Sequence, residues 1–178
     1  MNFPRILKKR KGYIDRIKPF MQKSVAKVLT GQRRVGKSFL LYQLIEEILA
    51  EEPDANIIYV NLEDFTFSSL QTAEDLHSYI ISHSKEKVKN YIFIDEIQDI
   101  PGFEKVIRSL LLNEDNDIYI TGSNAKMLSG ELATYLSGRY IEFKIYSLSY
   151  SEFLEFHGLT ESETSYELYS RYGGLPYL

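Results

Sequence analysis

The stretch from Leu29 to Leu44, LTGQRRVGKSFLLYQL, decides how the chain is expected to fold. Within it, Gly31 is followed after four residues by Gly36, Lys37 and Ser38, which is the spacing of a phosphate-binding loop. Glycines let the backbone turn with its N–H groups pointing inward, while the lysine supplies a charge and the serine an oxygen ligand for Mg²⁺. The alternative interpretation is an ordinary glycine-containing turn beside a lysine.

The flanking residues favour the phosphate loop, because such a loop needs a strand before it and an amphipathic helix after it. The segment 25–30 is short and rich in residues that favour a strand. After Ser38, apolar residues recur at helical spacing until Pro53. The start of that helix adds its N–H groups and its dipole to the same anion site. The candidate nucleotide-binding residues are Gly31, Gln32, Arg33, Arg34, Val35, Gly36, Lys37, Ser38 and Phe39.

Strand and helix patterns alternate through the rest of the chain. We predict strands at 57–62, 91–94, 117–121 and 140–145, and helices at 75–81, 101–112 and 127–136. This alternation predicts an α/β fold, namely a three-layer sandwich with a five-stranded parallel sheet. A short helix or turn within residues 13–21 is expected to lead into the first strand.

The pattern changes after the fifth strand, where two short helices are expected. Ser149 and Glu152 have the spacing of a capping box, and a second helix is predicted over residues 162–172. We therefore divide the chain into a basic arm and lead-in (1–22), a P-loop core (23–146) and a helical extension (147–178). The chain ends two residues after a GGLP turn, so we expect a lid or a further domain to follow.

Composition narrows the class of protein. A chain of 178 residues with 44% hydrophobic residues suits one domain with a small appendage, and the absence of cysteine excludes disulfides and thiolate metal sites. No apolar run approaches the ~18 residues of a membrane span, and no signal peptide is evident, so a cytoplasmic protein without membrane contact is expected.

Charge is distributed unevenly along the chain. Residues 1–20 hold seven basic residues against Asp15, a local charge of +6, and since the whole chain carries −4, the remainder carries −10. The basic cluster is interpreted either as a solvated arm or as a contact for nucleic acid. The acidic remainder argues against a broad nucleic-acid-binding face.

Two adjacent carboxylates follow the predicted strand at 91–94. Asp95 would lie at the carboxyl end of a parallel strand, where open α/β sheets bind ligands, and together with Ser38 it is the candidate Mg²⁺ ligand. Glu96 is the candidate base that orients and deprotonates a water attacking a phosphate. Taken alone, two acids after an apolar run are a common strand end, but here they accompany a phosphate loop.

Several motifs together resemble the AAA-type P-loop ATPases of bacteria and archaea. They are TGQRRVGKS, YIFIDEIQ, ITGSNAKML, LSGRYIEF, YSLSYSEFL and YGGLP. The resemblance implies ATP and Mg²⁺ as cofactors, ATP hydrolysis, and Walker A and Walker B roles for the first two motifs. It also implies a core that is normally followed by a winged-helix or nuclease-like domain.

Two further catalytic candidates come from position. Ser123 or Thr121, at the end of the fourth strand, would hydrogen-bond the attacking water, although Thr-Gly-Ser-Asn is also an ordinary turn. Arg139 precedes the fifth strand, where AAA-type ATPases place an arginine that reaches the γ-phosphate of a neighbouring subunit. This role would require a homo-oligomer, and the alternative is a surface ion pair.

Three functions are therefore weighed. The leading one is an ATPase, with Lys37 and Glu96 in the site, that drives a conformational change in a protein partner or in a missing C-terminal domain. The alternative is a nucleotide-gated binding or assembly module with negligible turnover, with association to DNA as a side hypothesis. A small-molecule phosphotransferase is disfavoured by the adjacent Asp95 and Glu96 and by the GGLP turn.

Overall fold

The computed structural model describes residues 8–123 and 135–176, and five parallel strands form one sheet within them. The sheet order is β2-β3-β4-β1-β5, and every neighbouring pair is parallel. The predicted five-stranded parallel α/β sheet is confirmed. The strands are β1 (Ala26–Thr30), β2 (Asn56–Asn61), β3 (Asn90–Asp95), β4 (Asn116–Gly122) and β5 (Tyr140–Lys144).

The helices follow the predicted segments with shifted ends. They are α1 (Lys11–Ile17), α2 (Lys37–Glu51), α3 (Ala73–His83), α4 (Phe103–Leu110), α6 (Tyr150–His157) and α7 (Glu163–Tyr172). The helix predicted from Pro101 begins two residues later, because Gly102 takes a φ of +76° that a helix interior does not allow. Most of the helix predicted over 127–136 lies outside the described residues.

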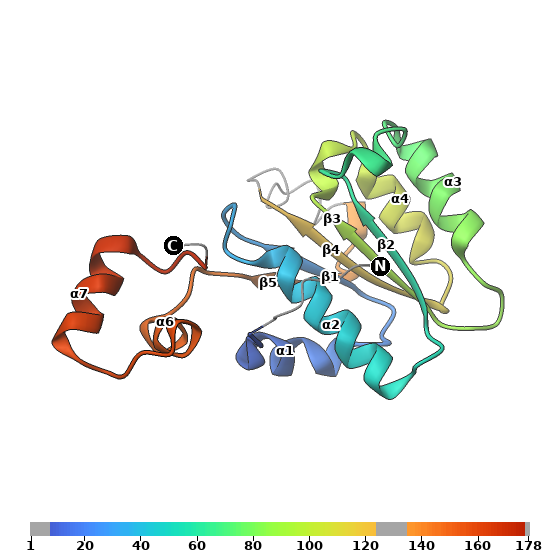
Figure 1. The fold of residues 1–178 in the computed structure, drawn as a ribbon. Helices are drawn as coiled ribbons and strands as arrows, with labels where there is room; N and C mark the ends of the chain where they lie inside the picture. Colours follow the sequence, from blue (N-terminus) through green and yellow to red (C-terminus); the bar gives the residue numbers. More distant parts are fainter. Residues whose placement is uncertain (1–7, 124–134, 177–178) are drawn as a thin grey trace.

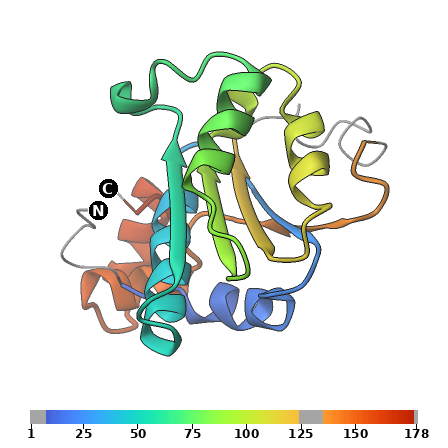
Figure 2. The same cartoon turned by 90° about the vertical axis from the view of Figure 1, so that its right-hand side faces the viewer.

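The sheet is covered by helices on both faces, as a three-layer sandwich requires (Figure 1). Figure 2 shows α3 and α4 in front of the strands. On that face Val28, Ile94 and Ile120 pack with the apolar stripes of α3 and α4. On the other face Leu29 and Phe93 pack with α1 and α2. Because both faces are buried, the central strands read as continuous apolar runs rather than as an alternation.

Residues from the predicted N-terminal arm take part in this core. Ile14 and Ile17 of α1 are buried against α2, and Pro19 lies in a 3₁₀ turn, Lys18–Phe20, that ends the helix. Lys9 and Lys18 both form ion pairs with Glu47 of α2, at 2.6 Å each. The lead-in to β1 is therefore packed against the core through α1 and the turn that follows it.

One ion pair is buried in the sheet at the end opposite to the phosphate loop. Lys27 of β1 and Asp117 of β4 are both fully buried, and the ammonium group of Lys27 forms an ion pair with the carboxylate. The Tyr119 hydroxyl (2.7 Å) and the Gln22 N–H (2.8 Å) donate to the second carboxylate oxygen. Burial lowers the pKa of Lys27, and Asp117 opposes that shift.

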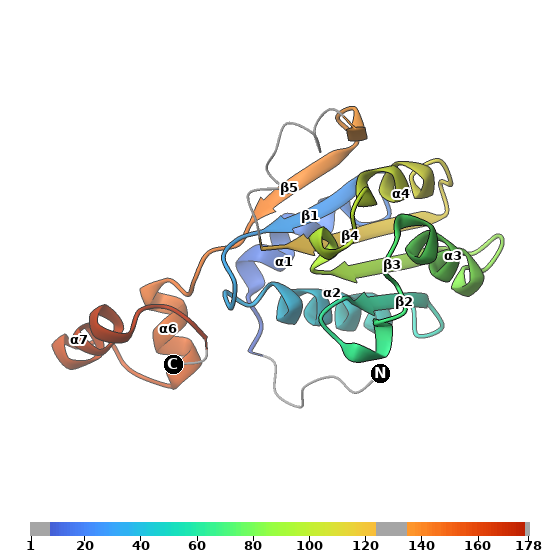
Figure 3. The same ribbon diagram turned by 90° about the horizontal axis from the view of Figure 1, so that it is seen from above.

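The helical extension forms a small unit beyond the carboxyl end of β5 (Figure 3). Capping boxes begin α6, at Ser149 with Glu152, and α7, at Ser162, so both predicted helix starts are confirmed. Phe153 of α6 and Tyr169 of α7 pack ring against ring, with centroids 5.3 Å apart. Among the described residues, no helix has the length and apolarity needed to cross a membrane. The cytoplasmic location stays a prediction.

The buried pair yields a stability prediction. Asp117→Asn is expected to lower the free energy of unfolding by about 3 kcal/mol, because it leaves the Lys27 ammonium buried without a counter-charge. Urea unfolding followed by circular dichroism measures the change. The matched control is Glu114→Gln, on an exposed side chain of the neighbouring turn, which should change stability by less than about 0.5 kcal/mol. Equal stability of the two variants would contradict the assigned role of the pair.

Candidate functional site

The loop between β1 and α2 turns on its two glycines. Gly31 has a φ of +150°, and a Cβ at this position would overlap the carbonyl oxygen of Ile145, just after β5. Gly36 has a φ of +94° and is the N-cap of α2, where no side chain caps the helix. Since the first N–H groups of a helix have no partner inside it, the start of α2 offers donors and a positive dipole end to an anion.

Lys37 folds back over the loop from the first position of α2. Its Nζ atom donates to the carbonyl oxygens of Gly31 (3.3 Å) and Gln32 (3.1 Å). The same atom lies 3.4 Å from Oε1 of Glu96, at the end of β3, and both side chains are buried. The structure thus joins the loop lysine and the predicted base, which are 59 positions apart in the sequence.

Asp95, the last residue of β3, is 1% exposed and is surrounded by hydroxyl groups. The hydroxyl groups of Thr121 and Ser38 hydrogen-bond its carboxylate, and the Tyr59 hydroxyl lies 3.4 Å from Oδ2. Burial raises the pKa of Asp95, and the bonds from Thr121 and Ser38 only partly oppose the shift. The carboxylate is thus held at an energetic cost.

The side chains of Ser38 and Asp95 supply oxygen atoms, the ligand type that Mg²⁺ prefers, so these residues fit the predicted ion. The hydrogen bond between them brings both groups to one point. Across the described part of the chain, no group of three His, Cys, Asp or Glu side chains could hold a metal by itself. A Mg²⁺ ion here would depend on phosphate and water oxygens for its remaining ligands, and its assignment stays a prediction.

Glu96 has a left-handed backbone, with a φ of +55°, directly after the strand. Burial raises the pKa of its carboxyl group. A 2.7 Å hydrogen bond from Gln98, the charge of Lys37 and a hydrogen bond from Ser123 outweigh burial, so the pKa lies below the ordinary value. The carboxylate is therefore ionised at neutral pH and engaged by three partners.

The two hydroxyl groups at the end of β4 have different surroundings. Thr121 is fully buried, donates to Asp95 and accepts a 3.0 Å hydrogen bond from the N–H of Glu96. Its proton and one of its two oxygen lone pairs are thus engaged inside the protein, and a contact of Thr121 with an attacking water stays a prediction. Ser123 is only half-buried and bonds the carboxylate of Glu96. The structure brings Ser123 next to the predicted base, and its catalytic role stays a prediction.

An open pocket of about 470 Å³ lies over this cluster. It is lined by the loop and helix residues 33, 34 and 36–39, together with Tyr42, Glu63 and Glu96. At its rim Arg33 forms an ion pair with Glu63 at 3.5 Å, and both side chains are exposed. A larger hollow of about 630 Å³ runs along α7 alone and contains none of these residues.

Sequence reasoning missed four polar residues around the site: Tyr42, Tyr59, Glu63 and Gln98. The rule that led to Asp95, that ligands bind beyond the carboxyl ends of parallel strands, would also have found Glu63, which follows β2 closely. Tyr59 lies in the middle of β2, and nothing in the residues around it distinguishes it from an ordinary strand tyrosine. No local signal therefore pointed to its contact with Asp95. Gln98 lies in the 3₁₀ turn Ile97–Asp99 and is aimed at Glu96 by that turn.

Arg139 is the one candidate that the structure leaves far from the cluster. Its carbonyl oxygen accepts a hydrogen bond from Ala26, at the beginning of β1, whereas the phosphate loop follows the end of that strand. At about 3.3 Å per residue, the length of β5 separates Arg139 from the loop. In its own chain Arg139 therefore lies at the amino-terminal ends of the strands, whereas the phosphate loop lies at their carboxyl ends.

Comparison with known families and proteins gives a consistent assignment of fold. Residues 23–154 match the model of the family described as AAA domain. A Haemophilus influenzae protein described as uncharacterized is 41% identical over 178 residues, which cover 94% of this chain and 43% of that protein. The chain thus spans less than half the length of this relative.

Solved structures with a similar fold include two forms of the protein DnaA. Domain III of the Thermotoga maritima replication initiation protein DnaA has a TM-score of 0.58 at 16% identity, over 89% of this chain and 75% of that one. AMPPCP-bound DnaA from Aquifex aeolicus has a TM-score of 0.56 at 14% identity, over 96% and 59%. At these identities the likeness concerns the fold alone.

The raised pKa of Asp95 yields a prediction about stability. Since ionising Asp95 costs more in the folded than in the unfolded chain, stability should fall as the pH rises from the unfolded pKa of about 4 through the raised folded pKa. Asp95→Asn removes this cost and should raise the free energy of unfolding at pH 7 by about 1 kcal/mol. Urea unfolding at several pH values measures both effects.

The matched control is Asp54→Asn, on an exposed aspartate in the turn before β2. It should unfold like the wild type at every pH. If Asp95→Asn were less stable than the wild type at pH 7, the hydrogen bonds of the ionised carboxylate would outweigh its burial, and the argument would fail.

Proposed function

The chain belongs to the AAA domain family of P-loop ATPases, and on that premise we propose that it binds ATP with Mg²⁺ at residues 31–39 and hydrolyses it. The observation that carries the proposal is the 3.4 Å contact between the Lys37 ammonium and the Glu96 carboxylate, because it joins a phosphate-binding group to a base. AMPPCP in a structural neighbour, Aquifex aeolicus DnaA, supports a nucleotide as the ligand. A Mg²⁺ ion held by Ser38 and Asp95 would neutralise phosphate charge.

Binding and chemistry are linked through Lys37. When the ammonium group turns from Glu96 to the β- and γ-phosphates, Glu96 loses a cation that holds its pKa down. Its carboxylate then becomes a stronger base, as general base catalysis requires. Glu96 orients and deprotonates the attacking water, with Ser123 as a second hydrogen-bonding group.

The energy of this cycle is proposed to be used outside the core. We assign residues 23–146 to the ATPase core and residues 147–178 to a helical extension that passes the change to a protein partner or to a following domain. Contact with DNA is not part of the proposal, because Lys9, Arg10 and Lys18 of the basic segment are all paired with carboxylates of the same chain.

One observation favours the alternative of a nucleotide-gated assembly module. The Glu96 carboxylate is engaged by Lys37, Gln98 and Ser123, and a base held this firmly would turn over slowly. The two functions differ in a measurable quantity. A gated module binds ATP with negligible phosphate release, whereas an ATPase releases phosphate over many cycles.

The proposed base is tested by Glu96→Gln. This change keeps the size and the hydrogen-bonding oxygen of the side chain but removes its basicity, so kcat for Mg²⁺-dependent phosphate release should fall about 10²- to 10⁴-fold. The affinity for ATP should stay within about threefold of the wild type, since Glu96 does not hold the phosphates. Phosphate release and titration with a fluorescent ATP analogue measure the two quantities.

Two further variants serve as a control for turnover and as a test of nucleotide binding. Glu63→Gln removes the other carboxylate that lines the pocket and should leave kcat nearly unchanged. Lys37→Ala should abolish binding of the analogue. Retained binding by Lys37→Ala would exclude the loop as the nucleotide site, and equal turnover by Glu96→Gln and the wild type would remove Glu96 as the base.

The position of Arg139 generates a prediction about assembly. Because the loop of its own chain lies at the opposite end of the strands, Arg139 is proposed to act on the γ-phosphate of a neighbouring subunit. Arg139→Ala should then lower kcat by about 10³-fold while leaving ATP affinity unchanged. The exposed Arg108→Ala on α4 is the matched control and should have wild-type activity.

Mixing two inactive variants separates this role from an ordinary surface ion pair. In an equimolar mixture of Lys37→Ala and Arg139→Ala, some interfaces combine an intact loop with an intact arginine. Activity should therefore exceed that of either variant alone. A mixture that stays inactive, or a sedimentation profile that is monomeric at all nucleotide concentrations, would refute the action of Arg139 in trans.

A further inference from the structure

Arg10 is a buried arginine in the segment that reads as a basic arm. Only 5% of the residue is exposed, and its guanidinium group forms a two-pronged ion pair with Glu152 of α6. Nε lies 2.8 Å from Oε1 of Glu152, and Nη2 lies 3.0 Å from Oε2. Such paired charge-assisted bonds fix both distance and orientation.

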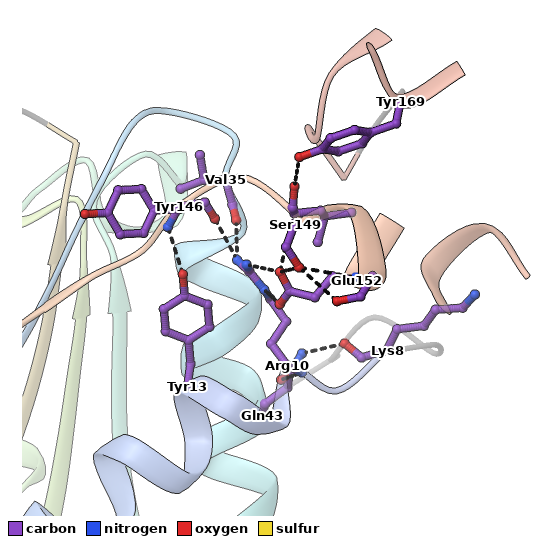
Figure 4. Close-up of polar contacts among 11 residues, drawn as sticks. Lys8, Arg10, Tyr13, Val35, Gln43, Tyr146, Ser149, Glu152 and Tyr169 are labelled. Carbon is purple, nitrogen blue, oxygen red and sulfur yellow. Dashed lines mark hydrogen bonds and ion pairs between the residues drawn. The ribbon is translucent and has the colours of Figure 1, made fainter. Parts of the chain in front are cut away.

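The remaining prong of the same guanidinium group reaches the phosphate loop (Figure 4). Nη1 donates to the carbonyl oxygen of Val35, within the loop, at 3.1 Å. It also donates to the carbonyl oxygen of Tyr146, in the segment that leads to α6, at 2.9 Å. One side chain thus binds the loop, the linker to the extension and the extension itself.

The contact with Val35 bears directly on anion binding. A trans peptide unit is planar, so its C=O and N–H groups point in opposite directions. No cis peptide bond occurs in the described residues. Arg10 binds the Val35 carbonyl, and neither Arg10 nor Val35 is among the residues that line the pocket, whereas Gly36, which carries the N–H of the same peptide unit, lines it. From this placement we infer that the bond favours the orientation in which the Gly36 N–H faces the pocket. Arg10 selects the peptide orientation that presents a donor to an anion.

Neighbouring residues hold Arg10 itself in place. The backbone N–H of Arg10 donates to Oε1 of Gln43 in α2 at 2.9 Å, and Gln43 is buried. The guanidinium carbon lies 4.5 Å from the ring centre of Tyr13, whose hydroxyl accepts a 3.1 Å hydrogen bond from the N–H of Tyr146. The arginine is therefore fixed from its backbone to its tip.

Glu152 connects Arg10 to the helical extension, because it belongs to α6. The carboxylate that binds Arg10 also accepts a 2.9 Å hydrogen bond from the N–H of Ser149, which caps α6. Leu148, just before this cap, donates to the carbonyl oxygen of Gly174 at 2.6 Å and accepts from the Tyr169 hydroxyl at 2.9 Å. A movement of α6 and α7 would therefore move the Glu152 carboxylate.

We propose that Arg10 is a positioning residue of the phosphate loop, and that through Glu152 the geometry of the loop depends on the placement of α6 and α7. The identity of the ligand as ATP rests on the proposed function, whereas the link between loop and extension rests on the contacts of Arg10 alone. By thermodynamic reciprocity, a ligand that favours the bound loop also favours one placement of the extension.

The test compares Arg10→Gln and Glu152→Gln with Lys9→Gln, which removes a neighbouring exposed cation that does not contact the loop. Amide hydrogen exchange is followed by mass spectrometry in segments 31–38, 146–157 and 90–95, the last as an internal reference in the central sheet. Each protein is measured alone and at saturating AMPPCP, whose dissociation constant is determined by calorimetry.

In the wild type, AMPPCP should slow exchange in both 31–38 and 146–157. Arg10→Gln should raise the dissociation constant about tenfold, as expected for loss of charge-assisted hydrogen bonds, and Glu152→Gln about threefold. At saturation both variants should be protected in 31–38 but no longer in 146–157. Lys9→Gln should match the wild type. A merely structural defect would speed exchange in 90–95 as well and would leave the ligand-dependent difference intact.

A separate arm without nucleotide keeps the link testable. Glu152 has no bond to the loop, and its side chain binds Arg10 with both oxygens, so Glu152→Gln alone is expected to speed exchange of 31–38 through Arg10. Unchanged exchange there, or continued protection of 146–157 by AMPPCP in Arg10→Gln, would overturn the proposal. If the wild type failed to bind AMPPCP, the proposed function would be wrong, and this arm would still decide the link. Glu152→Gln also serves if Arg10→Gln does not fold.

Discussion

The hydrogen bonds of Thr121 hold the Asp95 carboxylate and the backbone of Glu96 at the end of the strands where the phosphate loop begins. Its hydroxyl group donates to Asp95 and accepts from the N–H of Glu96, so β4 fixes both residues against β1. Because all three strands are parallel and adjacent, their carboxyl ends meet. Lys37 and Glu96 can then approach each other without any distortion of the sheet.

The buried charged groups of this domain differ in how far their charges are compensated. Lys27 and Asp117 neutralise each other at the far end of the sheet. Asp95 is compensated only in part, since burial raises its pKa despite its hydroxyl partners and the nearby charge of Lys37. A buried group whose pKa is shifted in this way is typical of a functional site. The apolar layers on both faces of the sheet supply the stability that offsets this cost.

The loop is shaped from outside as well as from its own sequence. Gly31 packs against the backbone of Ile145, and a Cγ atom of Pro176 would lie 3.9 Å from a Cβ at Gly36. Arg10 adds the hydrogen bond to Val35 and the ion pair with Glu152. Segments from both ends of the described chain therefore meet at the loop, which gives the helical extension a physical route to the site.

The periodicity of apolar residues determined the parallel α/β core, and the GxxxxGKS spacing determined where an anion would bind, since both depend on contacts close in sequence. Local signals also identified Asp95, Glu96, the capping box of α6 and the range of α7. The tertiary structure alone decided that Thr121 joins Asp95 to Glu96, that Gln98 engages Glu96, and that Arg139 lies away from its own loop. It alone also buried Arg10, because Glu152 and Tyr146, which bind its side chain, lie over a hundred residues away in the sequence and leave no periodic trace.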